Sequence, residues 1–306
     1  MNKIINANCL SGMKELPEKC VQTCVTSPPY FGLRDYGVEG QMGLEPTPQD
    51  FVGALVAVFQ EVKRVLRDDG TVWLNLGDSY SRDPKRGERS AENCGYHQHA
   101  KSGAGRASQH RINNGGLPEK NLIGIPWRVA FALQADGWYL RQDIIWAKPN
   151  PMPESVTDRC TKSHEYIFLL SKGPKYYFDY KAIKEKGVCP AGTKGAKGSA
   201  ERQSEPGVNA RPPEYKVYDG MRNKRDVWTV ATRPCKDAHF ATFPPELIRP
   251  CVLAGAPAGG LVLDPFMGAG TTAMVAKQEG RQYVGFELNP EYCQIAEKRI
   301  AAAKEA

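Results

Sequence analysis

The stretch VTSPPYFG, residues 25–32, combines groups that can hold a ligand rigidly. Pro28 and Pro29 can neither continue a helix nor donate to a sheet, and each restricts the residue before it. The hydroxyl of Ser27 stands at the start of this turn, and the aromatic ring of Tyr30 follows it. The sequence therefore indicates a fixed turn with a hydroxyl at one end and an aromatic face at the other.

A second candidate site lies in LVLDPFMGAGTTAMVA, residues 261–276. The pattern is typical of a strand, a tight turn and the start of a helix. Gly268 and Gly270 let the backbone approach a ligand closely, and the helix N-terminus supplies free N–H groups. Glu287 ends the next strand, 17 residues after Gly270, and its carboxylate there can accept hydrogen bonds from both hydroxyls of a ribose.

The same loop matches a dinucleotide fingerprint, which alone is a weak signal. Two features argue against a dinucleotide. The charge of Asp264 is unfavourable beside a pyrophosphate but favourable beside an ammonium group, and Pro265-Phe266 stiffens the turn. A nucleoside that carries an amino acid fits better, which points to S-adenosylmethionine. A nicotinamide dehydrogenase stays open as an alternative, and a titration of NAD against S-adenosylhomocysteine would separate the two.

Strands and helices alternate around these two sites. Apolar residues at helical spacing predict a helix over 48–67, begun by Pro48 and closed by DDG. A further helix is expected over 125–136. Such alternation predicts an α/β fold with a doubly wound, mostly parallel sheet. The expected strands cover 3–9, 21–26, 71–77, 139–147, 165–171 and the strands ending at Asp264 and Glu287.

The bulk composition is that of a globular protein. The chain has 306 residues, which suits one large α/β domain with insertions or two domains, and its net charge is +7. Nine cysteines show no framework spacing, so we expect reduced thiols. No secretory signal and no apolar run of about 18 residues is found, which predicts a cytoplasmic protein without a membrane contact.

Two stretches interrupt the alternation. Residues 80–116 are polar, basic and rich in glycine, and residues 181–236 hold 13 Lys or Arg against 6 Asp or Glu. Long loops of this kind are usually functional or disordered. The second stretch also carries Tyr215, Tyr218 and Trp228, and cations interleaved with aromatic rings suit a nucleic-acid surface.

Taken together, these blocks resemble one family. TSPPY early, DPFMGAGTT late, and RQDIIWAKPN with SHEYIFLLSK between them are similar to the permuted, β-class amino-methyltransferases of DNA. The resemblance implies a circularly permuted, Rossmann-like, seven-stranded sheet with basic insertions. It places the target-amine part in 1–180, the DNA target-recognition segment in 181–236 and the S-adenosylmethionine part in 237–306. It also implies that Ser27 and Gly268, about 240 residues apart in sequence, face one crevice.

The resemblance gives the proline turn a role in methyl transfer. The Ser27 hydroxyl and the Pro28 carbonyl would accept the two hydrogens of an exocyclic base amine, held rigidly by the prolines, and Tyr30 would stack on the base. A base inside a duplex is out of reach, so it must be flipped out. A serine in TSPPY favours N4 of cytosine, and N6 of adenine is the alternative. A DNA-binding module that only senses S-adenosylmethionine is the rival of another class.

Further matches extend the two candidate sites. HFATFPPEL resembles the segment that closes over the cofactor, and LNLGDSY resembles the strand end near the methyl group. The chain has Ala7-Asn8 where the family often has Gly-Asp, a position that contacts the adenine edge. The expected catalytic residues are Ser27, Pro28, Pro29 and Tyr30. The expected cofactor-binding residues are Asp264, Pro265, Phe266, Gly268, Gly270, Thr271, Glu287, Asn8, Asn75, Asp78 and Phe243. The expected DNA-binding residues are Arg34, Lys148, Arg222, Lys224 and Arg225.

Other chemistry is set aside. CGYHQH, with Cys94, His97 and His99, lacks a second ligand pair for zinc, so no metal is expected. Pro234-Cys235 and Pro250-Cys251 resemble the nucleophile of ring-carbon cytosine methyltransferases, but the rest of that pattern is absent. His164-Glu165 is expected to orient its strand. The expected partner is double-stranded DNA, with a homodimer and a cognate restriction endonuclease left open, in a bacterium or phage.

Overall fold

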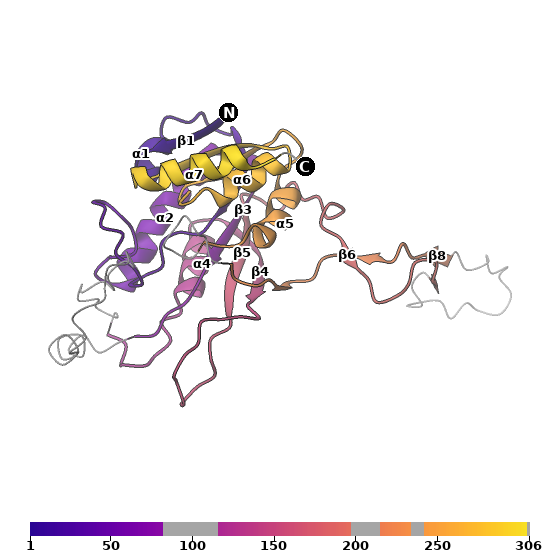
Figure 1. Cartoon of the computed structure of the whole chain (residues 1–306), viewed down its shortest axis with the longest axis horizontal. Helices are drawn as coiled ribbons and strands as arrows, with labels where there is room; N and C mark the ends of the chain where they lie inside the picture. The colour runs from indigo at the N-terminus through magenta and orange to yellow at the C-terminus, as the bar shows by residue number, and fades with distance from the viewer. Residues whose placement is uncertain (82–115, 197–214, 234–241, 305–306) are drawn as a thin grey trace. The chain divides into compact units, whose positions relative to one another are not determined.

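The computed structural model describes residues 1–81, 116–196, 215–233 and 242–304 (Figure 1). Contacts divide the chain into two units, one formed by Met1–Asp179 with Asp226–Ala306 and the other by Tyr180–Arg225. Residues 226–233, which the sequence analysis groups with the target-recognition segment, thus lie in the larger unit. Most of the 80–116 insertion falls outside the described residues.

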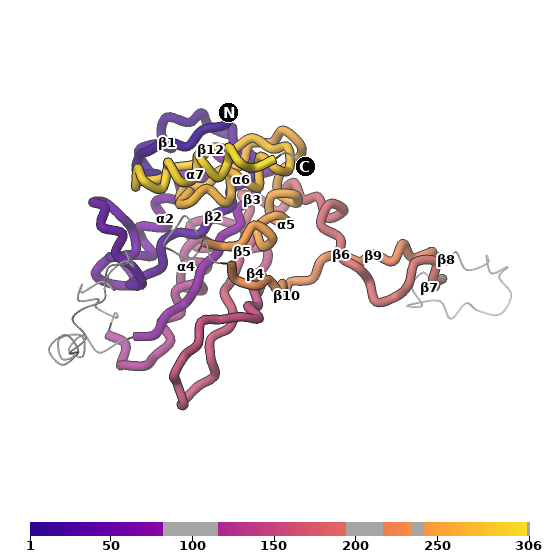
Figure 2. The backbone as a smooth tube through the Cα atoms, in the orientation of Figure 1, coloured from indigo at the N-terminus to yellow at the C-terminus, as the bar shows by residue number. Residues whose placement is uncertain are grey.

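The larger unit is built on an eight-stranded sheet, which can be followed in Figure 2. All neighbouring strands are parallel except β5, which is antiparallel to both of its neighbours. The strand order is β1 (Asn2–Asn6), β12 (Gln282–Glu287), β11 (Leu261–Asp264), β2 (Val21–Thr26), β3 (Leu66–Leu76), β5 (His164–Ser171), β4 (Tyr139–Ala147) and β10 (Val227–Thr229). The doubly wound, mostly parallel sheet is therefore confirmed.

The eighth strand, β10, extends the seven that the sequence predicts. Its three residues pair in parallel with Ile145, Trp146 and Ala147 of β4. Trp228 is only 5% exposed there, because it packs within the larger unit. Its expected place on a nucleic-acid surface is therefore corrected, since a buried ring offers no face to a base.

Helices lie in two layers (Figure 1). α1 (Cys9–Met13) packs on α2 (Pro48–Val65), which packs on α4 (Ile125–Ala135). In the second layer, α5 (Pro245–Gly255) packs on α6 (Thr271–Gln278), which packs on α7 (Pro290–Ala302). This is the layering that right-handed crossovers between parallel strands produce.

α2 shows how the sequence forms these layers. Thr47 caps its N-terminus by accepting a hydrogen bond from the Asp50 N–H at 3.1 Å, and the apolar side chains at helical spacing are fully buried. The helix ends at Val65, two residues before the expected end. β3 begins at once, so the expected DDG closure is part of a strand that starts five residues earlier than predicted.

The smaller unit, Tyr180–Arg225, contains two short antiparallel ribbons. β6 (Glu185–Lys186) pairs with β9 (Met221–Arg222), and β7 (Lys194–Ala196) pairs with β8 (Tyr215–Val217). Ion pairs support the first ribbon: Arg222 and Arg225 both contact the Glu185 carboxylate, at 2.9 and 3.0 Å. An isolated two-stranded ribbon is at best marginally stable in water.

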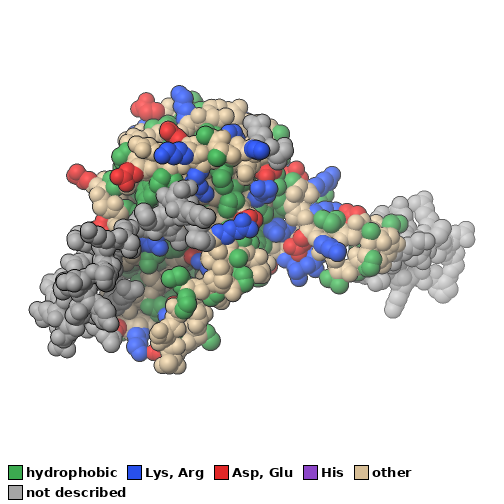
Figure 3. Space-filling model, in the orientation of Figure 1, with side chains coloured by type: hydrophobic (Ala, Val, Ile, Leu, Met, Phe, Trp, Pro, Cys, Tyr) green, Lys and Arg blue, Asp and Glu red, His purple; other side chains and the backbone are tan. Residues whose placement is uncertain are grey.

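Among the described helices, none combines the length and the apolar character that crossing a membrane requires. On the face drawn in Figure 3, the coloured Lys and Arg side chains lie among Asp and Glu side chains and hydrophobic ones. The basic excess of the chain therefore does not gather into one uniform patch among the coloured atoms of that face.

Candidate active site

The two sequence blocks meet at the carboxyl ends of the strands. β2 and β11 are neighbours, with Cys24 paired to Leu263. A cavity of about 570 Å³ opens beyond their ends and is lined by both Ser27 and Gly268. This size suits a small-molecule site. The predicted juxtaposition of Ser27 and Gly268 is therefore confirmed.

Asp264 ties the glycine loop to β2. One carboxylate oxygen accepts hydrogen bonds from the Thr26 hydroxyl at 2.6 Å and the Phe266 N–H at 3.0 Å. The other accepts from the Thr272 hydroxyl at 2.7 Å. The side chain lines the cavity but is 1% exposed, and this burial raises its pKa to about 6. Asp264 thus holds the two halves of the site together as well as lining it.

Glu287 fixes the other side of the glycine loop. Its Oε2 accepts the N–H of Gly268 at 2.8 Å, and its Oε1 accepts the N–H of Asn289 at 2.8 Å. Burial raises its pKa. Each carboxylate oxygen can accept a further hydrogen bond, so Glu287 keeps acceptor capacity toward the cavity that it lines.

The two glycines of the loop serve different purposes. Gly268 lines the cavity with φ +50, and an added Cβ would meet no atom closer than 4.0 Å. Gly270 is not among the lining residues, has φ +77, and an added Cβ would come within 2.7 Å of the Ala296 Cβ. Gly270 therefore lets α6 pack closely on α7, and its expected cofactor contact stays a prediction.

The proline turn presents its groups to the same cavity. Ser27, Pro28, Pro29 and Tyr30 all line it. The Tyr30 hydroxyl donates to Glu165 Oε2 at 2.6 Å, and the Ser27 side chain lies close enough to the Tyr30 hydroxyl to interact with it. Burial and the Glu165 charge raise the pKa of Tyr30 well above its usual value. The phenol is therefore a neutral group held in one orientation.

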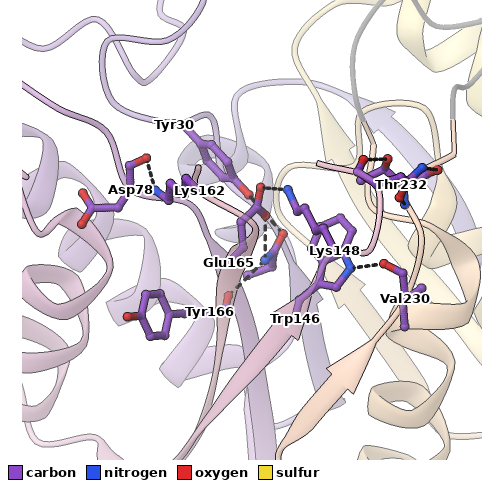
Figure 4. A network of polar contacts seen from close by, with 11 residues as sticks. Tyr30, Asp78, Trp146, Lys148, Lys162, Glu165, Tyr166, Val230 and Thr232 are labelled. Atoms are coloured by element: carbon purple, nitrogen blue, oxygen red, sulfur yellow. Dashed lines mark hydrogen bonds and ion pairs between the residues drawn. The ribbon is translucent and has the colours of Figure 1, made fainter. Parts of the chain in front are cut away.

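Glu165 is the centre of a polar network in Figure 4. Besides Tyr30, it accepts from Asn75 Nδ2 at 3.2 Å and pairs with the Lys148 ammonium. The Lys148 Nζ lies 4.2 Å from the centre of the Trp146 ring, and the indole N–H donates to the Val230 carbonyl at 2.7 Å. Four chain segments therefore meet at one carboxylate.

The sequence does not predict that Glu165 lies at the centre of this network. It predicts only that His164-Glu165 orients β5. The available signal is a single acidic residue near the start of a largely apolar strand, HEYIFLLS. The pairing of Glu165 with Trp146 in β4 depends on the strand register, which the sequence alone does not give. Lys148, predicted to bind DNA, contacts Glu165 at the cavity wall, and its DNA contact stays a prediction.

Asp78, an expected cofactor residue, contacts the start of a helix. Its carboxylate accepts the N–H groups of Ser79, Gly124 and Ile125 at 2.9 to 3.1 Å, which caps the start of α4. It is not among the residues that line the cavity. The Asp78 oxygens are thus engaged at a helix N-terminus, and the expected cofactor contact stays a prediction.

The other expected cofactor residues line the cavity. Asn8 caps α1, with its Oδ1 accepting from the Leu10 N–H at 2.9 Å. Asn75 is 4% exposed, and its amide bridges Glu165 and the Tyr166 carbonyl. The remaining members of this group that line the cavity are Pro265, Phe266, Thr271 and Phe243.

A loop contributes to one wall of the cavity. The N–H of Gly32 donates to the Gly43 carbonyl at 2.8 Å, which closes the base of the loop. Arg34 and Tyr36 lie between these residues and line the cavity. Arg34, a predicted DNA contact, is thus placed beside the proline turn, whereas Arg222, Lys224 and Arg225 belong to the smaller unit.

No group of three or more His, Cys, Asp or Glu side chains that could hold a metal ion occurs in the described part of the chain. Cys94, His97, His99 and Cys235 fall outside it. Cys251 lies within α5 and is fully buried, so a reaction partner cannot reach its thiol.

A model of the N6/N4 family, described as DNA methylase, matches residues 21–298. The chain belongs to this family. The DNA methylase is 48% identical over 298 residues to the Type II methyltransferase M.Cfr9I of Citrobacter freundii, with 97% of this chain and 87% of the relative covered. It is 47% identical to the Type II methyltransferase M.SmaI of Serratia marcescens, with 97% and 90% covered.

Solved structures share the fold of this DNA methylase. The PvuII DNA methyltransferase, titled cytosine-N4-specific, superposes with a TM-score of 0.64 at 17% identity, covering 97% of this chain and 86% of that one. A DNA modification methylase of Thermus thermophilus, titled putative and complexed with S-adenosyl-L-methionine, gives 0.59 at 22% identity, covering 98% and 93%.

Proposed function

We propose that this DNA methylase transfers a methyl group from S-adenosylmethionine to the N4 amine of cytosine in double-stranded DNA. The observation that carries the proposal is the meeting of Ser27 and Pro28 with Gly268 and Glu287 in one cavity. One side offers acceptors for an amine, and the other offers acceptors and a glycine turn for a nucleoside.

The lining residues fit S-adenosylmethionine. Asp264 and Glu287 are two buried carboxylates whose pKa values burial raises, so a positively charged ligand would lower the cost of their ionisation. The Glu287 oxygens would accept from the ribose hydroxyls, and the aromatic rings of Phe243 and Phe266 would form the apolar wall. When bound, the cofactor supplies an electrophilic methyl group.

The proline turn would hold the target amine. An exocyclic amine is a poor nucleophile because its lone pair is delocalised into the ring. Acceptance of its two hydrogens by Ser27 Oγ and the Pro28 carbonyl would aim the lone pair away from the ring plane, in a geometry fixed before the base arrives. Tyr30 would present its ring to the flipped base. An uncharged serine at the head of the turn favours cytosine.

DNA would contact two regions of the chain. Arg34 beside the cavity, and Arg222, Lys224 and Arg225 in the smaller unit, are proposed to bind phosphates, which contribute most of the affinity for DNA. The relatives are named Type II methyltransferases, and this supports a cognate restriction endonuclease as a partner. A homodimer remains a proposal from the family resemblance.

Methyl transfer from labelled cofactor to unmethylated genomic DNA, followed by mass spectrometry of the nucleosides, tests the proposal. N4-methylcytosine is expected. N6-methyladenine would overturn the choice of base and keep the mechanism. Absence of any methylated nucleoside, with S-adenosylhomocysteine bound, would overturn the activity.

Ser27→Ala tests the clamp in the same assay. We expect a loss of rate of about 10²-fold with cofactor affinity unchanged, because one acceptor for the amine is removed. The Ser171→Ala variant is a matched control, since it removes a hydroxyl that bonds the Gly173 carbonyl in the larger unit, away from the cavity lining.

A further inference from the structure

The polar network behind the proline turn connects the proposed amine clamp to a carboxylate. The Ser27 side chain lies close enough to the Tyr30 hydroxyl to interact with it, and that hydroxyl donates to Glu165 Oε2 at 2.6 Å. Glu165 in turn pairs with Lys148, and their side chains are 13% and 17% exposed. A line of oxygen atoms thus leads from the cavity to a pair of charged groups that still touch solvent.

Such a line matters because methylation leaves a proton to be removed. The target amine gains a methyl group and one positive charge, and it must lose one of its hydrogens to become the neutral product. The groups proposed to hold those hydrogens are a hydroxyl and a backbone carbonyl, and neither retains a proton at neutral pH. A stronger acceptor is needed within reach.

We propose that Glu165 is the terminal acceptor of this proton, which it receives through Ser27 and Tyr30. This inference rests on the proposed function. The amine N–H bond breaks as Ser27 Oγ gains that hydrogen, the Ser27 hydrogen passes to the Tyr30 oxygen, and the Tyr30 hydrogen passes to Glu165 Oε2. The amine ends neutral, both hydroxyls are regenerated, and Glu165 ends as a carboxylic acid that returns the proton to water.

Two ammonium groups lie near the Glu165 carboxylate. Lys148 pairs with the carboxylate, and Lys162 also lies close enough to interact with it electrostatically. When Glu165 is protonated, the Lys148 ammonium keeps a second favourable contact, the Trp146 ring at 4.2 Å. Asn75 contacts both Tyr30 and Glu165 and keeps the two aligned, at 3.2 Å each.

The arrangement also explains why Tyr30 would relay a proton and not store one. Its hydroxyl donates to the Glu165 carboxylate, and its oxygen can accept from the nearby Ser27 hydroxyl at the same time. Removal of that hydroxyl would break the line while leaving the aromatic ring in place for the base.

The test compares Glu165→Gln, Tyr30→Phe and the double variant. The substrate is an unmethylated duplex that contains the sequence which the wild-type protein methylates. Single-turnover rates, solvent deuterium isotope effects and affinities for that duplex and for S-adenosylhomocysteine are measured. Glu154→Gln is the matched control, because Glu154 is also paired with a cation, Arg159 at 2.7 Å, but does not line the cavity.

We expect each single variant to lose about 10²-fold in rate, with affinities and thermal stability within about twofold of wild type. Because the two residues act in series, the double variant should be no slower than the slower single variant. Addition of formate to a Glu165→Ala variant should restore part of the rate.

Three outcomes decide the matter. Glu165→Gln at the wild-type rate overturns the relay alone, since methyl transfer itself is intact. Losses that multiply in the double variant, without formate rescue, overturn it in favour of a purely structural role. A wild-type protein that binds S-adenosylhomocysteine but transfers no methyl group to DNA overturns the proposed function and the relay with it.

Discussion

The ring of Tyr30 lies directly on the backbone of Gly77, where an added Cβ would come within 2.6 Å of Tyr30 Cε2. Gly77 follows the end of β3 and is therefore part of the support of the proposed clamp. A side chain of any size at this position would push the ring away from its bonds to Glu165 and Asn75.

Gly77→Ala is accordingly expected to lower methyl transfer by at least about tenfold, because a small displacement of a positioning group is costly. Cofactor affinity should change little. Gly53→Ala is the matched control, since nothing lies within 4 Å of a Cβ added there. Equal rates for the two variants would show that the Tyr30 position is unimportant.

Gly270→Ala and Gly268→Ala should differ in kind. At Gly270 the left-handed φ of +77 and the contact with Ala296 at 2.7 Å act together, so we expect about 3 kcal/mol of lost stability. At Gly268 only the left-handed φ is costly, about 1 kcal/mol, but affinity for S-adenosylhomocysteine should fall. Urea unfolding measures the stability of each variant, and calorimetry measures its affinity for S-adenosylhomocysteine. A larger loss of stability at Gly268, with a larger loss of affinity at Gly270, would contradict the roles given to the two glycines.

Asp78→Ala is predicted to destabilise the protein by about 1–2 kcal/mol, since three backbone N–H groups at the start of α4 lose their acceptor. Affinity for S-adenosylhomocysteine should stay within about twofold of wild type. A large loss of affinity without a loss of stability would return Asp78 to the cofactor site.

Asp264 gives the stability a specific pH dependence. Burial raises its pKa in the folded protein to about 6 from a usual 3.8, so the folded state holds a proton that the unfolded state releases between these values. The contribution of Asp264 to the free energy of unfolding therefore falls by about 3 kcal/mol as pH rises from about 4 to 6. Above pH 6 this contribution is constant. The difference in unfolding free energy between wild type and Asp264→Asn should shrink over this range. A difference that is independent of pH would contradict the assignment.

The fold and the meeting of the two sites could be predicted from the sequence. Helical spacing in 48–67 and the strand and loop pattern of 261–276 are local properties, and they agree with the structure to within a few residues. The neighbouring position of Ser27 and Gly268 required the family resemblance, because no local pattern links residues so far apart.

The roles of several residues could not be predicted because tertiary contacts decide them. Asp78 stands at a strand end like a ligand-binding residue, but the N-terminus of α4 lies beside it. Trp228 stands among cations like a nucleic-acid contact, but β10 joins the sheet and buries it. Glu165 becomes important only through residues of three other segments.

The pairing of β2 with β11 also bears on the order in which the protein is made. Thr26 and Asp264 are hydrogen-bonded across 238 residues, and β1 pairs with β12, which lies still further along the chain. On the ribosome, β1 and one edge of β2 must therefore wait without partners until nearly the whole chain has emerged. The binding cavity is completed last, so a nascent chain that stops before β11 has an exposed apolar strand edge and no active site.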